Sequence, residues 1–441
     1  MNIHLIAIGG SAMHNMALAL HHKGYTITGS DDAIFSPSKD RLEKHDLLPK
    51  DMGWFPEKIT KNLDAIILGM HAREDNPELS KAKKLDIPIY SYPEYIFEQS
   101  KKKKRVVIGG SHGKTSITAM ILHVLKNLNI DCDYMVGAQL EGFDTMVKLT
   151  NEAPIIILEG DEYLSSPIDK RPKFHLYQPH IAVLSGIAWD HINVFPTFER
   201  YVDQFRIFKN MVAETLIYCE DDEKLRKLCL EATKCKLIPY STPEHVIENG
   251  ITKVENTEIL IFGNHNLQNL NAAMLVCKEL GISEEEFLKE ISTFKGASKR
   301  LELVKRTETS AIYKDFAHSP SKLKATSSAM KKQFTNRKLI ACIELHTFSS
   351  LNEEFLKQYK GCMNEPDTAI VYFSPDAIAH KKLEPITEDQ VHSSFDREDL
   401  LVFTDSEKLK KYLKSQNYEN QNLLMMSSGT FDGMELEELI T

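Results

Sequence analysis

Short apolar runs recur along this chain, and polar or glycine-rich turns separate them. Toward the N-terminus they cover 3–8, 26–29, 64–69 and 87–90, with a helical pattern over 16–22. Later runs cover 106–108, 154–162 and 180–187, and then 311–315, 339–343, 368–373, 400–403 and 423–426. Apolar runs of this kind predict buried strands, and the helical patterns between them predict crossover helices. We therefore expect an α/β protein built on parallel sheets.

The clearest chemical signal lies between the run 106–108 and a helical pattern over 115–128. Glycines in such a loop let backbone N–H groups turn toward one anion, and the helix N-terminus adds partial positive charge. Lys114 can reach the outer phosphates of a nucleotide, and the Thr115 hydroxyl is placed to ligate magnesium. The first glycine of the usual motif is replaced by Ile108. The loop predicts an ATP-phosphate site made of Gly110, Ser111, His112, Gly113, Lys114, Thr115 and Ser116.

Two other strands end in side chains that suit this site. The run 154–162 ends in Glu159-Gly-Asp-Glu162, and open α/β sheets bind ligands at the carboxyl ends of their strands. We expect Glu159 to be a magnesium ligand, the alternative being a simple acidic turn. His191 follows the next strand and is expected to bind metal or phosphate, unless it is a structural histidine.

Polar side chains also flank later elements. Asn266 and Asn269 precede a helix predicted over 270–280, and their amides suit either an adenine edge or helix capping. The strand over 311–315 ends at Asp315, and His318 follows it before the next helix.

The start of the chain can hold a nucleotide. Gly9 and Gly10 follow the first strand, and Asp31 follows the second, which is the order of a Rossmann-like opening. The glycine spacing departs from GxGxxG, so a dinucleotide and a nucleotide sugar both remain candidate ligands.

These elements predict three domains in 441 residues. We expect a Rossmann-like N-terminal domain over 1–102, a central P-loop ATPase-type parallel sheet over 103–297, and a Rossmann-like C-terminal domain over 298–441. The first boundary lies near the beginning of the basic run 101–105, which we expect to be a solvated linker rather than a contact surface.

Composition excludes several classes of function. The formal charge is −9 and no basic face accompanies it, which argues against a nucleic-acid partner. No apolar stretch reaches the roughly 18 residues of a membrane helix. The chain starts directly with a predicted strand, so we expect no signal peptide, no membrane partner and a cytoplasmic location. Seven cysteines without CxxC spacing indicate reduced thiols.

Taken together, these motifs resemble the Mur ligase family, the ATP-dependent amide ligases of peptidoglycan assembly. The segment 110–115 resembles the family's phosphate loop, 159–162 its magnesium-binding strand end, and 190–191 its second metal ligand. Residues 263–269 resemble its adenine-side motif, 299–302 its arginine entry to the last domain, and 315–320 its ribose-side strand.

The resemblance implies the three-domain fold, ATP and Mg²⁺ as cofactors, and a reaction through an acyl phosphate. The catalytic residues it implies are Lys114, Glu159, His191 and Arg300. Further ATP contacts implied are Asn266, Asn269, Arg300, Asp315 and His318, and the implied metal ligands are Thr115, Glu159 and His191.

Three N-terminal segments, 9–11, 29–31 and 75–78, resemble the domain that binds UDP-N-acetylmuramate in members acting on the sugar carboxylate. The substrate contacts implied there are Gly9, Gly10, Ser11, Ser30, Asp31 and Asn76.

Two segments, 169–174 and 426–433, are similar to the peptide ligases that reattach recycled L-Ala-γ-D-Glu-meso-diaminopimelate. We therefore expect this tripeptide as amine donor, with Lys170, Arg171 and Lys173 near its carboxylates unless they form a solvated basic loop. The alternative donor is L-alanine, as in the biosynthetic member of the family. The segment 344–350 departs from both subgroups around the donor pocket.

Overall fold

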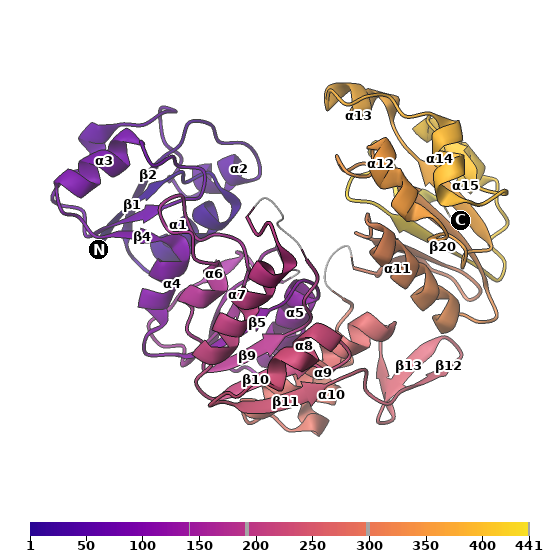
Figure 1. Cartoon of the computed structure of the whole chain (residues 1–441), viewed down its shortest axis with the longest axis horizontal. Helices are drawn as coiled ribbons and strands as arrows, with labels where there is room; N and C mark the ends of the chain where they lie inside the picture. Colours follow the sequence, from indigo (N-terminus) through magenta and orange to yellow (C-terminus); the bar gives the residue numbers. More distant parts are fainter. Residues whose placement is uncertain (141, 190–193, 297–299, 440–441) are drawn as a thin grey trace. The chain divides into compact units, whose positions relative to one another are not determined.

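The computed structural model describes residues 1–140, 142–189, 194–296 and 300–439. The chain divides into two compact units, one of residues 1–242 with 268–290 and one of residues 243–267 with 291–441 (Figure 1). Unit 1 holds two separate sheets, one in each of the first two predicted domains. The division into three domains at 102 and 297 stays a prediction.

The first sheet of unit 1 is parallel and has the order β2-β1-β3-β4. Its strands are β1 (Asn2–Ile6), β2 (Thr26–Ser30), β3 (Ala65–Leu68) and β4 (Ile89–Ser91). Helices α1 (Ser11–His22), α2 (Ser38–Glu43), α3 (Pro77–Lys84) and α4 (Tyr92–Ser100) accompany it. The first strand ends before the predicted residue 8 because Ala7 turns into the left-handed region, at φ 66°.

The second sheet of unit 1 has the order β11-β10-β9-β5-β8-β6-β7. Its strands are β5 (Lys104–Gly109), β6 (Cys132–Met135), β7 (Val147–Lys148), β8 (Ile155–Glu159), β9 (Ile181–Leu184), β10 (Thr215–Cys219) and β11 (Lys236–Tyr240). All pairs are parallel except β6 with β7. Strand β5 lies between β8 and β9, and its last residues pair with Glu159 and Leu184. The carboxyl ends of these three strands therefore meet.

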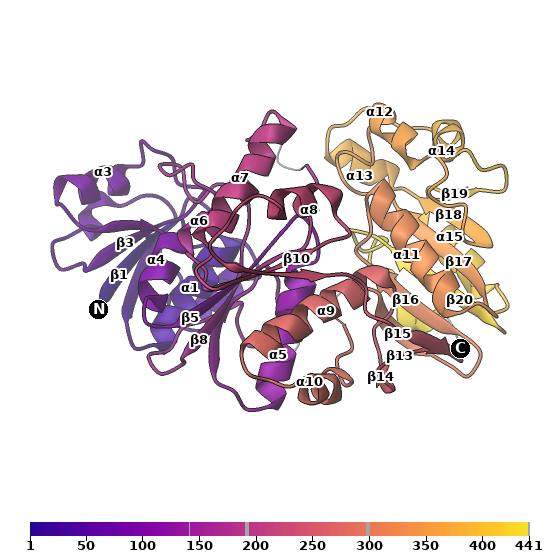
Figure 2. The same ribbon diagram turned by 60° about the horizontal axis from the view of Figure 1, so that its bottom comes forward.

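Helices cover both faces of this sheet (Figure 2). Helices α6 (Lys173–Leu176), α7 (Phe198–Met211) and α8 (Glu223–Cys229) lie on one face. Helices α5 (Lys114–Asn127), α9 (Asn264–Glu279) and α10 (Glu284–Ile291) lie on the other. The start of α9 corrects one expectation: residues 264–269 form its first turns and do not precede a helix beginning at 270.

Unit 2 contains a small antiparallel sheet and a larger six-stranded one. The small sheet, β12 (Val246–Glu248), β13 (Ile251–Val254) and β14 (Thr257–Ile259), was not predicted from the sequence. The larger sheet has the order β15-β16-β20-β17-β18-β19, and only β15 is antiparallel. Its strands are β15 (Glu302–Arg306), β16 (Ala311–Asp315), β17 (Lys338–Glu344), β18 (Thr368–Tyr372), β19 (Leu401–Phe403) and β20 (Gln421–Met426), joined by α11 (Pro320–Gln333), α12 (Glu353–Leu356), α13 (Pro375–His380), α14 (Glu388–Phe395) and α15 (Ser406–Lys414).

Both faces of the larger sheet are buried. Along β17, Ala341 and Ile343 enter one hydrophobic core, whereas Ile340 and Cys342 enter the other. This burial explains why the strand is a continuous apolar run and not an alternating one. The prediction of an α/β fold with parallel sheets is confirmed.

Within the described part of the chain, no helix is both long enough and apolar enough to span a bilayer. The seven cysteines carry free thiols, and all except Cys132 are buried.

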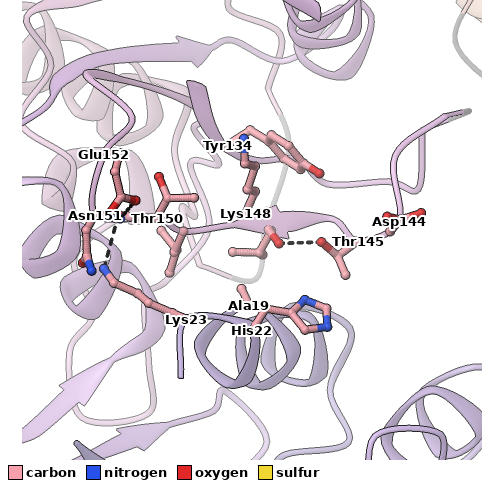
Figure 3. A pocket seen from close by; sticks show the side chains of 12 residues that line it. Ala19, His22, Lys23, Tyr134, Asp144, Thr145, Lys148, Thr150, Asn151 and Glu152 are labelled. Atoms are coloured by element: carbon pink, nitrogen blue, oxygen red, sulfur yellow. Dashed lines mark hydrogen bonds between the residues drawn. The ribbon is translucent and has the colours of Figure 1, made fainter. Parts of the chain in front are cut away.

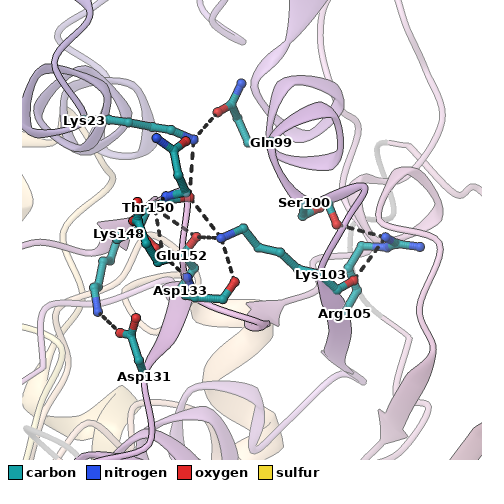
Figure 4. A network of polar contacts seen from close by, with 12 residues as sticks. Lys23, Gln99, Ser100, Lys103, Arg105, Asp131, Asp133, Lys148, Thr150 and Glu152 are labelled. Atoms are coloured by element: carbon teal, nitrogen blue, oxygen red, sulfur yellow. Dashed lines mark hydrogen bonds and ion pairs between the residues drawn. The ribbon is translucent and has the colours of Figure 1, made fainter.

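A buried ion pair within the second sheet of unit 1, between the residue before β5 and a residue of β6, corrects the expectation of a solvated linker at 101–105 (Figure 4). Lys103 Nζ lies 2.8 Å from Asp133 Oδ2, and the side chains are 6% and 0% exposed. Lys103 also donates to the carbonyl oxygens of Thr150 and Ala153, both at 2.9 Å. Arg105 is buried too and donates to the carbonyl of Tyr177 at 3.0 Å. Part of the basic run is therefore an internal contact.

Asp133→Asn should destabilise the protein by about 3–5 kcal/mol, because it leaves the Lys103 ammonium buried without a counter-charge. The free energy of unfolding in urea measures this effect. Lys101→Ala is the control, since its pair with Glu98 is exposed and its loss should change stability by less than about 1 kcal/mol. Equal small effects of the two substitutions would show that the buried pair does not stabilise this sheet.

Candidate active site

The predicted phosphate loop lies at the centre of the carboxyl edge of the central sheet. It leaves β5 after Gly109 and enters α5 at Lys114. Gly113 precedes that helix at φ 79°, and Gly110 has φ 119°. A Cβ at Gly110 would collide with Ser185 Oγ, and one at Gly113 with Asn269 Oδ1. Both glycines are therefore required by conformation and by space.

The two polar residues at the start of α5 have defined partners. Lys114 Nζ donates to the Gly110 carbonyl oxygen at 2.7 Å and to Glu162 Oε2 at 2.9 Å. Thr115 Oγ1 donates to Glu159 Oε1 at 2.9 Å. The structure thus brings Lys114, Thr115 and Glu159 together, as the sequence predicts.

Three carboxylates and two lysines lie at this strand end. Glu162 pairs with Lys114, and Asp161 pairs with Lys173 at 2.6 Å. Burial alone would raise the pKa of Asp161, but the Lys173 ammonium holds it below its ordinary value. Burial disfavours the charged form of Lys173 as well, yet its interactions with Tyr92 and Asp161 raise its pKa to about 12. Each lysine therefore neutralises one carboxylate.

Glu159 is the third carboxylate, and no ion pair is formed to it among the described residues. It accepts hydrogen bonds from Thr115 Oγ1 and, at 2.8 Å, from the Gly137 backbone N–H. Burial raises the pKa of Glu159 above its ordinary value, although these two hydrogen bonds oppose the shift. A half-buried carboxylate that no described lysine or arginine neutralises favours the binding of a metal ion.

The donor set at Glu159 fits Mg²⁺, which prefers carboxylate and hydroxyl oxygens. Thr115 and Glu159 would hold the ion from adjacent elements. No cluster of three histidine, cysteine or acidic side chains suited to a metal occurs in the segments that the structure describes. The predicted ligand His191 lies outside the described residues.

The N-terminal loop is closed by Asp31. Its Oδ2 accepts from the Gly9 backbone N–H at 2.7 Å, which links the ends of β1 and β2. Gly10 precedes α1 and Ser11 begins it, while Ser30 is buried at the end of β2. Asn76 is buried and caps α3 through its side-chain oxygen. Five of the six predicted substrate contacts, all but Asn76, therefore lie at the carboxyl ends of β1 and β2.

Two of the three predicted donor-binding cations, Arg171 and Lys173, are already paired. Arg171 makes a two-pronged contact with Asp169 and also reaches Glu94 at 3.2 Å. Lys173 is bound to Asp161, while Lys170 is exposed. This segment therefore supplies little uncompensated positive charge for a larger anionic donor.

In unit 2, the predicted ATP contacts lie around Phe316. The Arg300 guanidinium lies 5.2 Å from the Phe316 ring, and His318 Nδ1 lies 2.9 Å from the Phe316 carbonyl oxygen. Asp315 Oδ2 accepts from the Leu301 N–H at 2.7 Å. Asn266, in the first turn of α9, donates through its side-chain amide to the carbonyl oxygen of Phe262 at 3.0 Å.

Glu344, at the end of β17, connects two segments that lie far apart in the sequence, 344–350 and 426–433. Its Oε2 accepts from the Phe431 N–H at 2.9 Å and from the Ser427 hydroxyl. His346 Nδ1 lies 3.5 Å from the other carboxylate oxygen. The segments 344–350 and 426–433 therefore form one cluster.

Sequence analysis missed three residues of the site. The Gly137 backbone N–H donates to Glu159, and a Cβ added at this position would lie only 2.8 Å from the carboxylate. Glu162 stands in a motif that the sequence did single out, but its pairing with Lys114 needs the fold. Tyr201 donates to Glu162 at 2.9 Å, and nothing in the sequence separates it from the core aromatics of α7.

Known proteins identify this arrangement. Residues 2–104 match the model of the Mur ligase family catalytic domain, and residues 108–277 match that of the Mur ligase middle domain. The UDP-N-acetylmuramate–L-alanine ligase of Sulfurihydrogenibium sp. (strain YO3AOP1) is 32% identical over 387 residues, which cover 84% of this chain and 82% of that protein.

Solved structures show the same fold. The UDP-N-acetylmuramate–alanine ligase of Thermotoga maritima superposes with a TM-score of 0.69 at 20% identity, covering 98% of this chain and 97% of that one. A murein peptide ligase from Psychrobacter arcticus gives a TM-score of 0.62, also at 20% identity and with the same coverage. The chain therefore belongs to the Mur ligase family and is an ATP-dependent ligase that forms a C–N bond.

Proposed function

We propose that the protein joins the carboxylate of UDP-N-acetylmuramate to the amine of L-alanine. The observation that carries this proposal is the likeness to the L-alanine ligase of Sulfurihydrogenibium sp., which extends over 84% of the chain. The site supports it, because the carboxyl edge of the central sheet presents the Lys114 ammonium, the Thr115 hydroxyl and the Glu159 carboxylate, which forms no ion pair among the described residues.

The proposed reaction has two steps. A carboxylate oxygen of the sugar attacks the γ-phosphorus of ATP, so that an acyl phosphate forms and ADP leaves. The amine nitrogen then attacks the carbonyl carbon, phosphate leaves, and the nitrogen gives up a proton. Lys114 stabilises the charge that moves between the phosphate oxygens. Thr115 and Glu159 would hold Mg²⁺, which supplies further positive charge to those oxygens when it is bound.

The sugar nucleotide is assigned to the N-terminal sheet. Gly9, Gly10 and Ser11 follow β1, and Asp31 fixes this turn by binding the Gly9 N–H. The sequence-based division into domains 1–102, 103–297 and 298–441 then corresponds to sugar-nucleotide, ATP and amine-donor parts.

A second candidate donor is the tripeptide L-Ala-γ-D-Glu-meso-diaminopimelate. The segments 169–174 and 426–433 favour it, since they resemble peptide ligases. The pairing of Arg171 with Asp169 and of Lys173 with Asp161 weakens the charge argument for it. L-Alanine therefore stands as the donor and the tripeptide as its rival.

The donor is tested by offering ATP, magnesium and UDP-N-acetylmuramate with L-alanine or the tripeptide, and weighing the products. We expect kcat/KM for L-alanine to exceed that for the tripeptide by about tenfold or more. A reversed ratio would establish the tripeptide as donor. No product with either amine, despite intact ATP binding, would contradict the sugar substrate as well.

Lys114→Met should lower kcat by about a hundredfold or more, because it removes a charge that stabilises the transition state. Binding of UDP-N-acetylmuramate, measured by calorimetry, should stay unchanged. Lys104→Met is the matched control, since Lys104 begins the same strand and pairs with Glu214 at 2.9 Å. A Lys114 variant with the turnover of the control would refute the phosphate-loop assignment.

Glu159→Gln should raise the Mg²⁺ concentration needed for half-maximal activity by about tenfold or more, since a neutral amide binds the ion less well. The side chain keeps its size, so the fold should be preserved. Glu152→Gln, an exposed change before the same strand, is the control. An unchanged magnesium requirement in the Glu159 variant would show that the ion binds elsewhere.

A further inference from the structure

A chain of hydrogen bonds leads from Lys114 into the protein interior. Lysine has three N–H donors, and Lys114 uses one on the Gly110 carbonyl and another on Glu162. Glu162 is buried, and its second oxygen accepts from the Tyr201 hydroxyl at 2.9 Å. The position of the ammonium therefore depends on a carboxylate that a tyrosine in turn orients.

The same tyrosine also reaches the beginning of the phosphate loop. Its hydroxyl oxygen lies 3.0 Å from Ser111 Oγ. Ser111 Oγ lies 2.9 Å from the Ala188 carbonyl oxygen and accepts from the Ala188 N–H at 2.8 Å. Tyr201 thus contacts the loop through Ser111 and, by way of Glu162, through Lys114.

Tyr201 is well suited to act as a fixed point. It is fully buried on α7, and its ring packs against Phe195 and Phe205 at centroid distances of 5.5 and 5.2 Å. A tyrosine has few rotatable bonds, so packing of its ring also fixes its hydroxyl. A flexible lysine side chain, by contrast, loses much rotamer freedom when it is held in place.

We propose that Glu162 and Tyr201 are positioning residues for Lys114. Two donors of the ammonium are fixed on protein oxygens, which directs the third donor to the nucleotide phosphates. Holding the cation in advance avoids reorganisation when charge moves between phosphate oxygens. The proposal rests on the assignment of 110–116 as the ATP-phosphate loop.

Tyr201→Phe removes one hydroxyl and keeps the ring, and Glu162→Gln keeps the shape of the side chain. Each should weaken ATP binding by about tenfold, the usual cost of a lost hydrogen bond to a charged group. Each should also lower kcat while the KM for the sugar nucleotide stays unchanged. Tyr240→Phe is the control, because Tyr240 is buried at the end of the edge strand β11 of the same sheet. It should bind ATP like the wild type.

A double-mutant cycle with Lys114→Met separates positioning from a structural effect. ATP dissociation constants are measured by calorimetry for Lys114→Met, for Tyr201→Phe and for the double variant. If Tyr201 acts through Lys114, Tyr201→Phe should have no further effect in the Lys114→Met background.

The proposal would be overturned if Tyr201→Phe weakened ATP binding equally in the wild type and in Lys114→Met. It would also be overturned if the two single variants, Tyr201→Phe and Glu162→Gln, both bound ATP with wild-type affinity. Wild-type ATP affinity in Lys114→Met would instead refute the phosphate-loop assignment itself. The two ideas therefore fail in different measurements.

Discussion

The arrangement of the site follows from an excess of negative charge at the carboxyl edge of the central sheet. Three carboxylates lie within four residues at the end of β8, and among the residues that the structure describes two lysines pair with them. Burying a carboxylate is costly unless a cation or several donors meet it. Lysines neutralise Asp161 and Glu162, so the carboxylate that still needs a cation is Glu159, beside the Thr115 hydroxyl. The position where the protein needs a cation is thus set by pairings elsewhere in the cluster.

This cluster depends on strand order, which local sequence patterns do not specify. The apolar runs located twelve of the seventeen strands that the structure describes in the three main sheets, because strands buried on both faces are continuous apolar segments. The strands β6, β7, β10, β11 and β15 were not predicted. The order β9-β5-β8 results from crossover connections and brings together residues far apart in sequence. The antiparallel strands β12 to β14 were missed because their residues are partly exposed and carry no long apolar run. The start of α9 was missed since asparagines suit a turn as well as the first turn of a helix.

Site residues could be predicted where a local motif fixes their position, and could not where their role depends on the three-dimensional arrangement. Lys114, Thr115 and Glu159 stand at strand or helix ends, where the motif itself implies a position. Tyr201 follows the spacing of a core aromatic on α7, and only its hydroxyl contacts distinguish it. The run 101–105 shows the opposite error, because charge alone suggested solvent for Lys103 and Arg105, which the fold buries. Charged residues indicate function only when their partners are known.

The amine donor shows how far motif likeness extends. The segment 426–433 resembles peptide ligases, and the segment 344–350 departs from both subgroups, so they gave opposite indications when considered one at a time. In the structure Glu344 binds the Phe431 N–H and the Ser427 hydroxyl, and His346 lies against the same carboxylate. A Cβ at Gly429 would come within 2.8 Å of Glu344 Oε2, so the glycine is needed for this close approach. A substitution at Glu344 would remove the acceptor of the Ser427 and Phe431 hydrogen bonds. The two segments therefore form one structural feature. Donor preference is therefore expected to depend on this cluster as a whole more than on Arg171 and Lys173, whose charges are matched by Asp169 and Asp161.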